Sequence, residues 1–259
     1  MATYLDAILA AHRARAADDA RPLERLVEQA REVPPVRDFG GALQAPGLAV
    51  IAEVKRRSPS KGPLAPDLVP GFLAGRYAAG GAAALSVLTD EEHFGGSPAD
   101  LVEARSAVDL PVLRKDFTVG ARDVADARLM GADAVLLIVA ALDDAELRDL
   151  HALADELGLA TLVEAHDEVE VERALAAGAR VVGVNQRDLG TFRVDADRAV
   201  RVARAIPDGV VKVAESGVRD GADVARLAAA GYDAVLVGEH LVTSGDPTRA
   251  LQELVATCS

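Results

Sequence analysis

The amino-acid sequence predicts a single (β/α)8 TIM barrel with an N-terminal helical extension. From residue 48 onward, short apolar runs alternate with longer amphipathic runs that are rich in alanine. Eight such pairs fit into about 210 residues, which is the size expected of a (β/α)8 barrel. A helix–glycine–strand pattern also recurs at 129–137, 176–184 and 229–237. A doubly wound open sheet is the alternative, but that fold rarely contains eight evenly spaced strands.

The composition fits this fold. Half of the 259 residues are apolar, yet aromatic residues make up only 3% and tryptophan is absent. A core made of Val, Leu, Ile and Ala suits a parallel sheet that is covered by helices. Because the chain contains no low-complexity linker, we expect one barrel domain over residues 1–259, with residues 1–47 as its N-terminal helical extension.

The extension comes first in the chain. Residues 3–32 have a charged, helical pattern with an apolar face in each half, and Pro34 and Pro35 end it. Since this segment precedes the first strand, we expect it to pack outside the barrel. We expect His12 on this segment, and His151 on a later predicted helix, to face solvent.

The eight strands are short apolar runs, and each is followed by a helix with one polar and one apolar face. Strands are predicted at 48–54, 83–88, 111–114, 133–139, 160–164, 180–184, 210–214 and 233–237. Helices are predicted at 67–79, 97–107, 121–130, 143–157, 167–177, 195–205, 219–230 and 246–256.

Capping residues mark the ends of many of these helices. Asp143 and Glu146 have the spacing of a capping box, with Asp in place of Ser or Thr. The pattern of an N-cap followed by proline at the first helical position occurs at Ser97-Pro98 and Asp246-Pro247. Glycine stands where a helix should stop at Gly80, Gly131, Gly158, Gly178 and Gly231.

The formal net charge of −13 argues against nucleic acid or an anionic membrane as the main partner. A small anionic substrate is still compatible, because a few placed cations determine the local potential. We see no signal peptide and no run of about 18 apolar residues. The single cysteine, Cys258, cannot form an intrachain disulfide, which fits a reducing compartment. We therefore expect a cytoplasmic protein, and a monomer because no large apolar patch is evident.

Polar residues gather at the carboxyl ends of the predicted strands, whereas the strand interiors are apolar. The first strand ends with Glu53 and Lys55, which share a face because residues two apart on a strand point the same way. One such pair alone would indicate a surface salt bridge. The alternative interpretation of all the polar strand ends together is a polar rim that solvates the top of the barrel. However, strand ends converge at one mouth of a barrel, where active sites lie. The other polar ends are Thr89-Asp90, Lys115-Asp116-Phe117, Glu164 with His166, Asn185 to Asp188, Glu215-Ser216-Gly217 and Gly238-Glu239.

The turns after the last two strands indicate phosphate binding. Ser216-Gly217 and Gly238-Glu239 occupy these turns, where many barrels hold phosphate through backbone N–H groups. Either glycine alone would indicate only a tight turn, but two at these positions favour an anion site. We expect no metal, because no metal-ligand spacing relates His93, His151, His166 and His240.

The stretch from Ala52 to Gly62, Ala-Glu-Val-Lys-Arg-Arg-Ser-Pro-Ser-Lys-Gly, resembles the signature sequence of indole-3-glycerol-phosphate synthase. The similarity covers about residues 40–250, and this first block is its most specific part. Further blocks similar to the family follow in the same order at Leu88 to Asp90 with Phe94 and Gly96-Ser97, Leu113 to Phe117, Gly183 to Leu189, and Ala214 to Val218. The resemblance implies a TIM-barrel carboxy-lyase of tryptophan biosynthesis.

The resemblance also implies a reaction without cofactors on a phosphorylated small molecule, 1-(2-carboxyphenylamino)-1-deoxyribulose 5-phosphate. The aromatic carbon that bears the carboxylate attacks the ketone, CO2 leaves, and loss of water then gives the indole. Such a site has to protonate the ketone oxygen, hold the carboxylate near its target, and finally remove a hydroxyl and a proton.

The family's acids and bases map onto charged strand ends. Lys115 is implied to be the general acid at the ketone; pairing with Asp116 is discounted because adjacent strand residues point in opposite directions. Lys55 is implied to hold the substrate carboxylate, and Glu53 to orient Lys55 or relay protons. Glu164 is implied to be the second acid or base. Whether Lys55 or Glu164 acts on the leaving hydroxyl stays open.

The remaining implied site residues bind the substrate. Asn185 and Glu215 position sugar hydroxyls, and Phe117 stacks against the anthranilate ring. Arg187 either clamps the aromatic carboxylate or is a structural partner of Glu53. The phosphate is implied to bind at Ser58, Ser216, Gly217, Gly238 and the backbone N–H of Glu239.

The chain departs from the family pattern in three places, none of which removes an implied catalytic group. Gln186 replaces the second of two consecutive Asn, Arg122-Asp123 replaces a Tyr-Gln pair, and Leu241-Val242 replaces a Leu-Met pair. The Arg122-Asp123 change affects the loop that follows Lys115. We expect His166 to be a bystander.

Two other functions are alternatives. Phosphoribosylanthranilate isomerase shares the phosphate turns but typically uses an Asp and a Cys, and the only cysteine here, Cys258, lies beyond the last strand. A non-catalytic phosphate-binding barrel is the second alternative. A specialised paralogue would carry out the same reaction as the synthase. Loss of catalysis is disfavoured because the charged residues of the site are all present: Glu53, Lys55, Lys115, Glu164 and Glu215.

Overall fold

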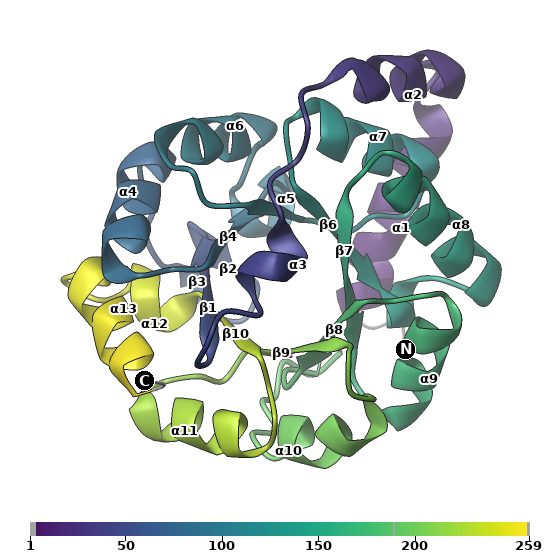
Figure 1. The fold of residues 1–259 in the computed structure, drawn as a ribbon. Helices are drawn as coiled ribbons and strands as arrows, with labels where there is room; N and C mark the ends of the chain where they lie inside the picture. The colour runs from purple at the N-terminus through teal and green to yellow at the C-terminus, as the bar shows by residue number, and fades with distance from the viewer. Residues whose placement is uncertain (1–3, 189, 258–259) are drawn as a thin grey trace.

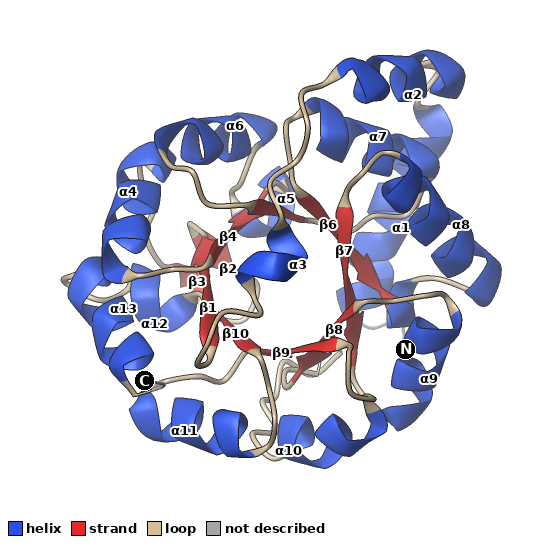
Figure 2. Ribbon diagram, viewed as in Figure 1, coloured by secondary structure: helices blue, strands red, loops and turns tan. Residues whose placement is uncertain are grey.

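A computed structural model describes residues 4–188 and 190–257, and in it eight parallel strands close into a barrel. The order around the barrel is β1-β10-β9-β8-β7-β6-β5-β4, so β1 completes the ring between β4 and β10. Figure 2 shows the strands as an inner ring and the helices as an outer ring. The predicted TIM barrel is confirmed. Cys258, which the sequence places beyond the last strand, lies outside the described residues.

Every predicted strand is present, and the bounds agree with the predictions to within one residue. Short runs of Val, Ile, Leu and Ala form these strands because both of their faces are covered. The barrel strands are β1 (Ala49–Val54), β4 (Ala84–Leu88), β5 (Val112–Lys115), β6 (Ala134–Ile138), β7 (Ala160–Ala165), β8 (Val181–Asn185), β9 (Val211–Glu215) and β10 (Ala234–Val237).

The predicted outer helices are also present, and several predicted caps are formed. Asp143 accepts hydrogen bonds from the backbone N–H of Glu146, whose side chain accepts from the N–H of Asp143, which completes the capping box. The outer helices are α4 (Pro70–Gly80), α6 (Pro98–Ala107), α7 (Ala121–Leu129), α8 (Asp144–Glu156), α9 (Glu168–Ala176), α10 (Arg198–Val202) continued by η2 (Ala203–Ala205), α11 (Gly221–Ala229) and α13 (Pro247–Ala256).

Short elements that the sequence did not predict follow several strands at the mouth of the barrel. Each is too short to produce a readable hydrophobic period. They are the antiparallel hairpin of β2 (Arg57–Ser58) and β3 (Gly62–Pro63), the helices α5 (Glu91–Phe94) and α12 (Glu239–Val242), and the 3-10 turn η1 (Val139–Ala141).

The N-terminal extension forms α1 (Tyr4–Asp18), α2 (Leu23–Glu32) and α3 (Phe39–Ala42), and it packs on the outside of the barrel as expected. Helix α3 covers the opening at the amino ends of the strands, and Phe39 is only 1% exposed there. In Figure 1, α3 lies across the near opening of the barrel, whereas α1 lies on the far side. The extension therefore reaches both ends of the barrel.

The core between strands and helices is aliphatic. Its fully buried large side chains are mostly leucine, with Tyr77 and Phe39 as aromatic exceptions and no tryptophan anywhere in the sequence. The hydroxyl of Tyr77 donates to the backbone oxygen of Glu53 at 3.0 Å, which ties α4 to the end of β1. Each helix within the described residues is too short or too polar to cross a lipid bilayer.

Candidate active site

A cavity of about 620 Å³ opens at the carboxyl ends of the strands. Its wall contains side chains from all eight barrel strands or from the loops directly after them. Every site residue predicted from the sequence lines this cavity: Glu53, Lys55, Ser58, Lys115, Phe117, Glu164, Asn185, Arg187, Glu215, Ser216, Gly217, Gly238 and Glu239. The polar strand ends therefore converge on one enclosed volume rather than forming a solvated rim.

Lys115, the last residue of β5, places its amino group between two carboxylates. Its Nζ lies 3.3 Å from Oε2 of Glu164 and 3.4 Å from Oε2 of Glu215. Both carboxylates are almost completely buried. Asp116 pairs instead with Arg114, at 2.9 Å. The prediction that Lys115 does not pair with Asp116 is confirmed.

These groups shift one another's pKa. Burial alone would lower the pKa of Lys115, but the charges of Glu164, Glu215 and Glu53 outweigh it and raise that pKa. Burial and the charge of Glu164 raise the pKa of Glu215 to about 8. Burial also opposes ionisation of Glu164, but Lys115 and His166 lower its pKa below the ordinary value. The site thus holds a charged ammonium, an ionised carboxylate and a carboxyl group that is readily protonated.

Glu53 and Lys55 leave β1 on the side of the cavity and form an ion pair with each other. The prediction that they share a face is confirmed, since Val54 between them is buried in the core. Gly238 leaves room for this pair at the end of β10. A Cβ at Gly238 would overlap the Glu53 carboxylate and lie 3.0 Å from Nζ of Lys55.

Gly183 makes similar room inside the barrel, and sequence reasoning gave it no role. A Cβ at this position of β8 would collide with the carboxylate of Glu215 and would lie 3.2 Å from Cδ1 of Leu162. A glycine inside an apolar strand often marks such a close approach. That signal was present in the sequence, but it did not identify Glu215 as the approaching side chain.

The turn after β9 has an unusual backbone. Ser216 and Gly217 both have positive φ angles, of 65° and 79°. This conformation is unfavourable for serine, so surrounding contacts have to hold it. Gln186 provides one of them, because its buried side-chain Nε2 donates to the backbone oxygen of Ser216 at 2.7 Å. Gln186, which the sequence showed only as a departure from the family pattern, therefore supports the predicted phosphate turn.

A cation lies near the other predicted phosphate ligands. Ser58 belongs to the hairpin after β1, and Glu239 begins α12 after Gly238. Lys61 also lines the cavity, and its Nζ lies 2.7 Å from Oε1 of Glu239. Lys61 is not among the predicted phosphate ligands, although it follows Ser58 by three residues in the same loop.

Phe117 and Phe94 give the cavity an apolar part, with ring centroids 6.5 Å apart. Arg187 enters from β8, where its Nη1 lies 3.4 Å from Oγ of Ser60 and 3.2 Å from the backbone oxygen of Phe192. Its predicted alternative role as the partner of Glu53 is not what the structure shows, because Lys55 is the ion-pair partner of Glu53.

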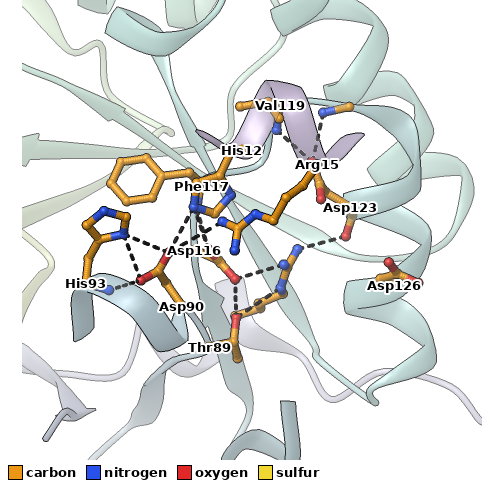
Figure 3. A network of polar contacts seen from close by, with 12 residues as sticks. His12, Arg15, Thr89, Asp90, His93, Asp116, Phe117, Val119, Asp123 and Asp126 are labelled. Atoms are coloured by element: carbon orange, nitrogen blue, oxygen red, sulfur yellow. Dashed lines mark hydrogen bonds and ion pairs between the residues drawn. The ribbon is translucent and has the colours of Figure 1, made fainter. Parts of the chain in front are cut away.

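Helix α1 reaches this mouth through a polar network, shown in Figure 3. Nε2 of His12 lies 2.9 Å from Oδ2 of Asp90, and Nη2 of Arg15 lies 3.8 Å from the same oxygen. The other oxygen of Asp90 accepts from His93 on α5. His12 also stacks near Phe117, with ring centroids 5.3 Å apart. The expectation that His12 faces solvent is therefore wrong, since His12 is only 8% exposed. Its partner Asp90 lies 78 residues away in the sequence, so no local pattern reveals this contact.

Two further observations concern histidines. His151 was also expected to face solvent, but it is only 4% exposed on the inner face of α8. Ligand atoms of His12, Asp90 and His93 lie within 4.8 Å of one another, a grouping close enough for a metal ion that sequence spacing did not reveal. Both oxygens of Asp90 accept hydrogen bonds from these residues.

Solved structures with a similar fold include a thiamine phosphate pyrophosphorylase from Pyrococcus furiosus, with a TM-score of 0.62, 17% identity and coverage of 81% of this chain and 95% of that chain. An N-acetylmannosamine-6-phosphate 2-epimerase from Clostridium perfringens has a TM-score of 0.62 and 14% identity, and covers 79% of this chain and 90% of its own. At such identities the likeness shows the fold alone.

Sequence comparison is more specific. The family model described as indole-3-glycerol phosphate synthase matches residues 5–254. A protein of that name from Nocardioides sp. is 54% identical over 254 residues, which is 97% of this chain and 98% of the relative. Another, from Mycolicibacterium vanbaalenii, is 51% identical over 256 residues, which is 98% of this chain and 94% of the relative. The chain therefore belongs to the indole-3-glycerol phosphate synthase family, the decarboxylating, ring-closing lyases of tryptophan biosynthesis.

Proposed function

We propose that the mouth of the barrel converts 1-(2-carboxyphenylamino)-1-deoxyribulose 5-phosphate into indole-3-glycerol phosphate, with Lys115 as the acid of the ring-closing step. The observation that supports this most is the position of Lys115, whose ammonium group lies in the cavity between Glu164 and Glu215 at 3.3 and 3.4 Å. A proton donor fixed in this way suits a reaction in which negative charge grows on one oxygen.

In the first step, the aromatic carbon that bears the carboxylate attacks the ketone carbon. The ketone oxygen gains charge and takes a proton from Lys115. The surrounding carboxylates raise the pKa of Lys115, so its amino group is protonated at neutral pH and is ready to donate. Water is largely excluded there, because the side chain of Lys115 is only 15% exposed.

In the same step the substrate carboxylate has to stay near its target until it leaves as CO2. Lys55 holds it through charge, and Glu53 orients Lys55 through their ion pair. Arg187 adds a second cation to the wall of the cavity, and its guanidinium hydrogen bonds leave the group fixed at the end of β8. Positioning of this kind lowers the entropy cost of ring closure.

Dehydration needs a second acid and a base. Glu164 takes the proton from the carbon that becomes part of the indole ring, and either Glu164 or Lys55 protonates the leaving hydroxyl. Asn185 and Glu215 hydrogen bond to the sugar hydroxyls and keep the chain of the substrate in place. Glu215 suits this role because burial and nearby charge raise its pKa, so its carboxyl group can also donate a hydrogen bond.

The two ends of the substrate bind in different parts of the cavity. Phe117, together with Phe94, supplies the apolar surface on which the anthranilate ring stacks. The phosphate binds to N–H groups and hydroxyls of the turns after β1, β9 and β10, with Lys61 as an additional cation. The phosphate ligands are Ser58, Ser216, Gly217, Gly238 and the backbone N–H of Glu239.

Indole fluorescence tests the reaction directly, because the protein contains no tryptophan of its own. Purified protein is mixed with the substrate without added metal or cofactor, and indole emission is followed for wild type and Lys115→Met. We expect a strong signal from wild type and a loss of at least about a hundred-fold in the variant, as for removal of a general acid. An equal signal from both proteins would remove Lys115 from this role, and a silent wild type would refute the reaction.

The finer properties of the enzyme are also proposals. We propose a cytoplasmic monomer that binds neither nucleic acid nor membrane. The net charge of −13 and the single cysteine support this. Light scattering should give a mass near 26.9 kDa for the monomer; twice that value would show a dimer.

A further inference from the structure

A histidine and a carboxylate lie directly behind Glu164, outside the wall of the cavity. His166 follows β7, and its Nδ1 lies 3.0 Å from Oε2 of Glu170 in the first turn of α9. The same oxygen accepts from the backbone N–H of His166 at 2.8 Å. Glu170 therefore fixes the imidazole from behind, and the other ring nitrogen points toward Glu164, with Nε2 3.7 Å from Oε1.

Those two facing atoms share an unusual property. Among the described residues, Nε2 of His166 and Oε1 of Glu164 are both buried and both without a hydrogen-bond partner. Buried polar atoms are nearly always paired, because an unpaired one loses its interaction with water. The gap of 3.7 Å between them exceeds a hydrogen bond by less than 1 Å, and a small rotation of either side chain closes it.

The three groups form a line from the cavity toward the surface. The exposed fraction of the side chain rises from 1% for Glu164 to 14% for His166 and 19% for Glu170. Glu164 lines the cavity, whereas His166 and Glu170 do not, so the histidine reaches the substrate only through Glu164.

The proposed reaction requires a supply of protons from solvent to the buried site. A carbon–carbon bond forms between the aromatic ring and the ketone carbon, and the bond to the carboxylate breaks, so CO2 leaves without a proton. The ketone oxygen leaves as water and takes two protons, only one of which the ring carbon supplies. Each turnover therefore consumes one proton from solvent, although Glu164 is almost completely buried and the side chain of Lys115 is only 15% exposed.

We propose that His166, held by Glu170, is a positioning residue that orients Glu164 and relays to it the proton that each turnover takes from solvent. This proposal rests on the proposed function of the site and assigns a task to a residue that the sequence analysis treated as a bystander. The proton moves from His166 Nε2 to Oε1 of Glu164 and then to the amino group of Lys115, which lies 3.3 Å from the other oxygen of Glu164. The imidazole regains its proton from the solvent side.

The charge of Lys115 controls when this transfer occurs. While Lys115 is an ammonium ion, its charge helps to lower the pKa of Glu164 against the effect of burial. Once Lys115 has given its proton to the ketone oxygen, that effect is lost and burial raises the proton affinity of Glu164. The proton then moves inward, and Lys115 is charged again for the next turnover.

The groups facing His166 favour the protonated form of its ring. Burial lowers the pKa of His166, but the hydrogen bond that the ring donates to Glu170 and the charge of Glu164 on β7 raise it above the ordinary value. Arg198 on α10 opposes this to a smaller extent. The rate should therefore fall as pH rises through the raised pKa of His166, because the relay then has no proton to pass on.

His166→Gln tests the relay, with His151→Gln as the matched control because His151 is also a buried histidine, on α8. Rates over many turnovers are followed by indole fluorescence from pH 6 to 9, because the relay recharges Lys115 between one turnover and the next. We expect His166→Gln to be about ten-fold slower or more at neutral pH, with KM within two-fold and without the decline at high pH. His151→Gln should keep the wild-type rate and pH profile.

Glu170→Gln separates a relay from a structural role, because Gln can still accept from the backbone N–H of His166. Loss of the negative charge should move the decline in rate to lower pH while the melting temperature stays near that of wild type. An unchanged profile in either variant overturns the relay. So does a uniform loss of rate in His166→Gln that keeps the wild-type profile.

An activity-free readout distinguishes this proposal from the reaction on which it rests. The imidazole of His166 can be titrated by NMR in wild type and in Glu164→Gln, and loss of the carboxylate charge should lower its pKa. A titration that does not respond overturns the relay whatever the reaction is. A silent wild-type enzyme, in contrast, overturns the reaction.

Discussion

Gly183 affects the site because it has no side chain. It lies in β8 directly beside the carboxylate of Glu215, which occupies the space that a Cβ would take. Glu215 in turn is one of the two carboxylates that hold Lys115. A small change at this position should therefore move the acid of the reaction without touching the substrate.

We expect Gly183→Ala to lower kcat by about a hundred-fold, the loss that a shift of about 1 Å in a catalytic group can cause. Gly75→Ala is the control, since Gly75 is exposed on α4 and a Cβ there would meet nothing within 4 Å. That variant should keep full activity and gain about 0.5–1 kcal/mol of stability. Steady-state kinetics and thermal melts measure both, and a fully active Gly183→Ala would contradict the packing argument.

At the scale of residues, the charged groups of the site were predictable from the sequence. The residues that support these groups by leaving space or by holding a turn were not. Charged strand ends such as Lys115 and Glu164 stand out in an apolar pattern, and a barrel brings such ends together. Gly183 supports the site by leaving space for Glu215 on the next strand, and Gln186 supports it by holding Ser216 in the turn after β9. Which neighbour a buried side chain meets depends on the register between strands, and local sequence does not contain that information.

At the scale of elements, α1 is attached to the mouth mainly by side chains that lie far apart in the chain. His12 bonds to Asp90 at 2.9 Å and also contacts Phe117, which lines the cavity. Burial opposes ionisation of Asp90, but the hydrogen bonds from His12 and His93 lower its pKa. The contribution of this carboxylate to stability is therefore present above its unfolded pKa of about 3.9 and is lost as pH falls further.

We expect His12→Ala to raise KM about five- to ten-fold, because loss of a buried hydrogen bond of about 1 kcal/mol or more loosens α1 and the wall around Phe117. Arg13→Ala on the same helix is the control. Arg13 makes a part-exposed ion pair with Glu146 and should change KM little. Hydrogen exchange should be faster throughout α1 in His12→Ala; unchanged exchange would show that other contacts hold the helix.

The helix boundaries were predictable because caps and apolar periods are local. The contact of α1 with the mouth was not, since its partner Asp90 lies between β4 and α5, far away in the sequence. Periodicity shows which face of a helix is apolar, and His12 lies on that face of α1, four residues after Ile8, where both are buried. Polar contacts between elements 78 residues apart leave no such period in the sequence.

At the scale of the whole molecule, we propose that the extension and the barrel form a single folding unit over residues 1–259. Arg37 supports this, because its backbone N–H donates to Asp133 at 2.8 Å and its guanidinium donates to the backbone oxygens of Val108 and Leu110. Arg128 on α7 likewise donates to the backbone oxygen of Val33. The connection between extension and barrel is thus a continuous set of hydrogen bonds.

We expect one cooperative thermal transition for the whole chain, and Arg37→Met should lower its stability by about 1–3 kcal/mol because several part-buried carbonyl oxygens lose their donor. Circular dichroism and hydrogen exchange of α2 should report the same midpoint. If the extension melted before the barrel, the two would be separate units.

The stability of the free enzyme should also depend on pH through Glu215. Because the folded-state pKa of Glu215 is raised to about 8, the folded protein binds one more proton than the unfolded chain between about pH 4.5 and 8. Stability should therefore fall as pH rises through this window, by at most about 1.4 kcal/mol per pH unit. Thermal melts of wild type and Glu215→Gln check this: the variant should lose most of the slope, and an equally steep variant would assign it elsewhere.

The core built without tryptophan has a consequence for the cell. The barrel fills its interior with Leu, Val, Ile and Ala, and no codon for tryptophan is needed anywhere in its 259 residues. Its family makes the precursor of that same amino acid. Ribosomes can therefore finish this protein when charged tryptophanyl-tRNA has run out. Starvation for the end product leaves synthesis of this enzyme possible at the time when the pathway is most needed.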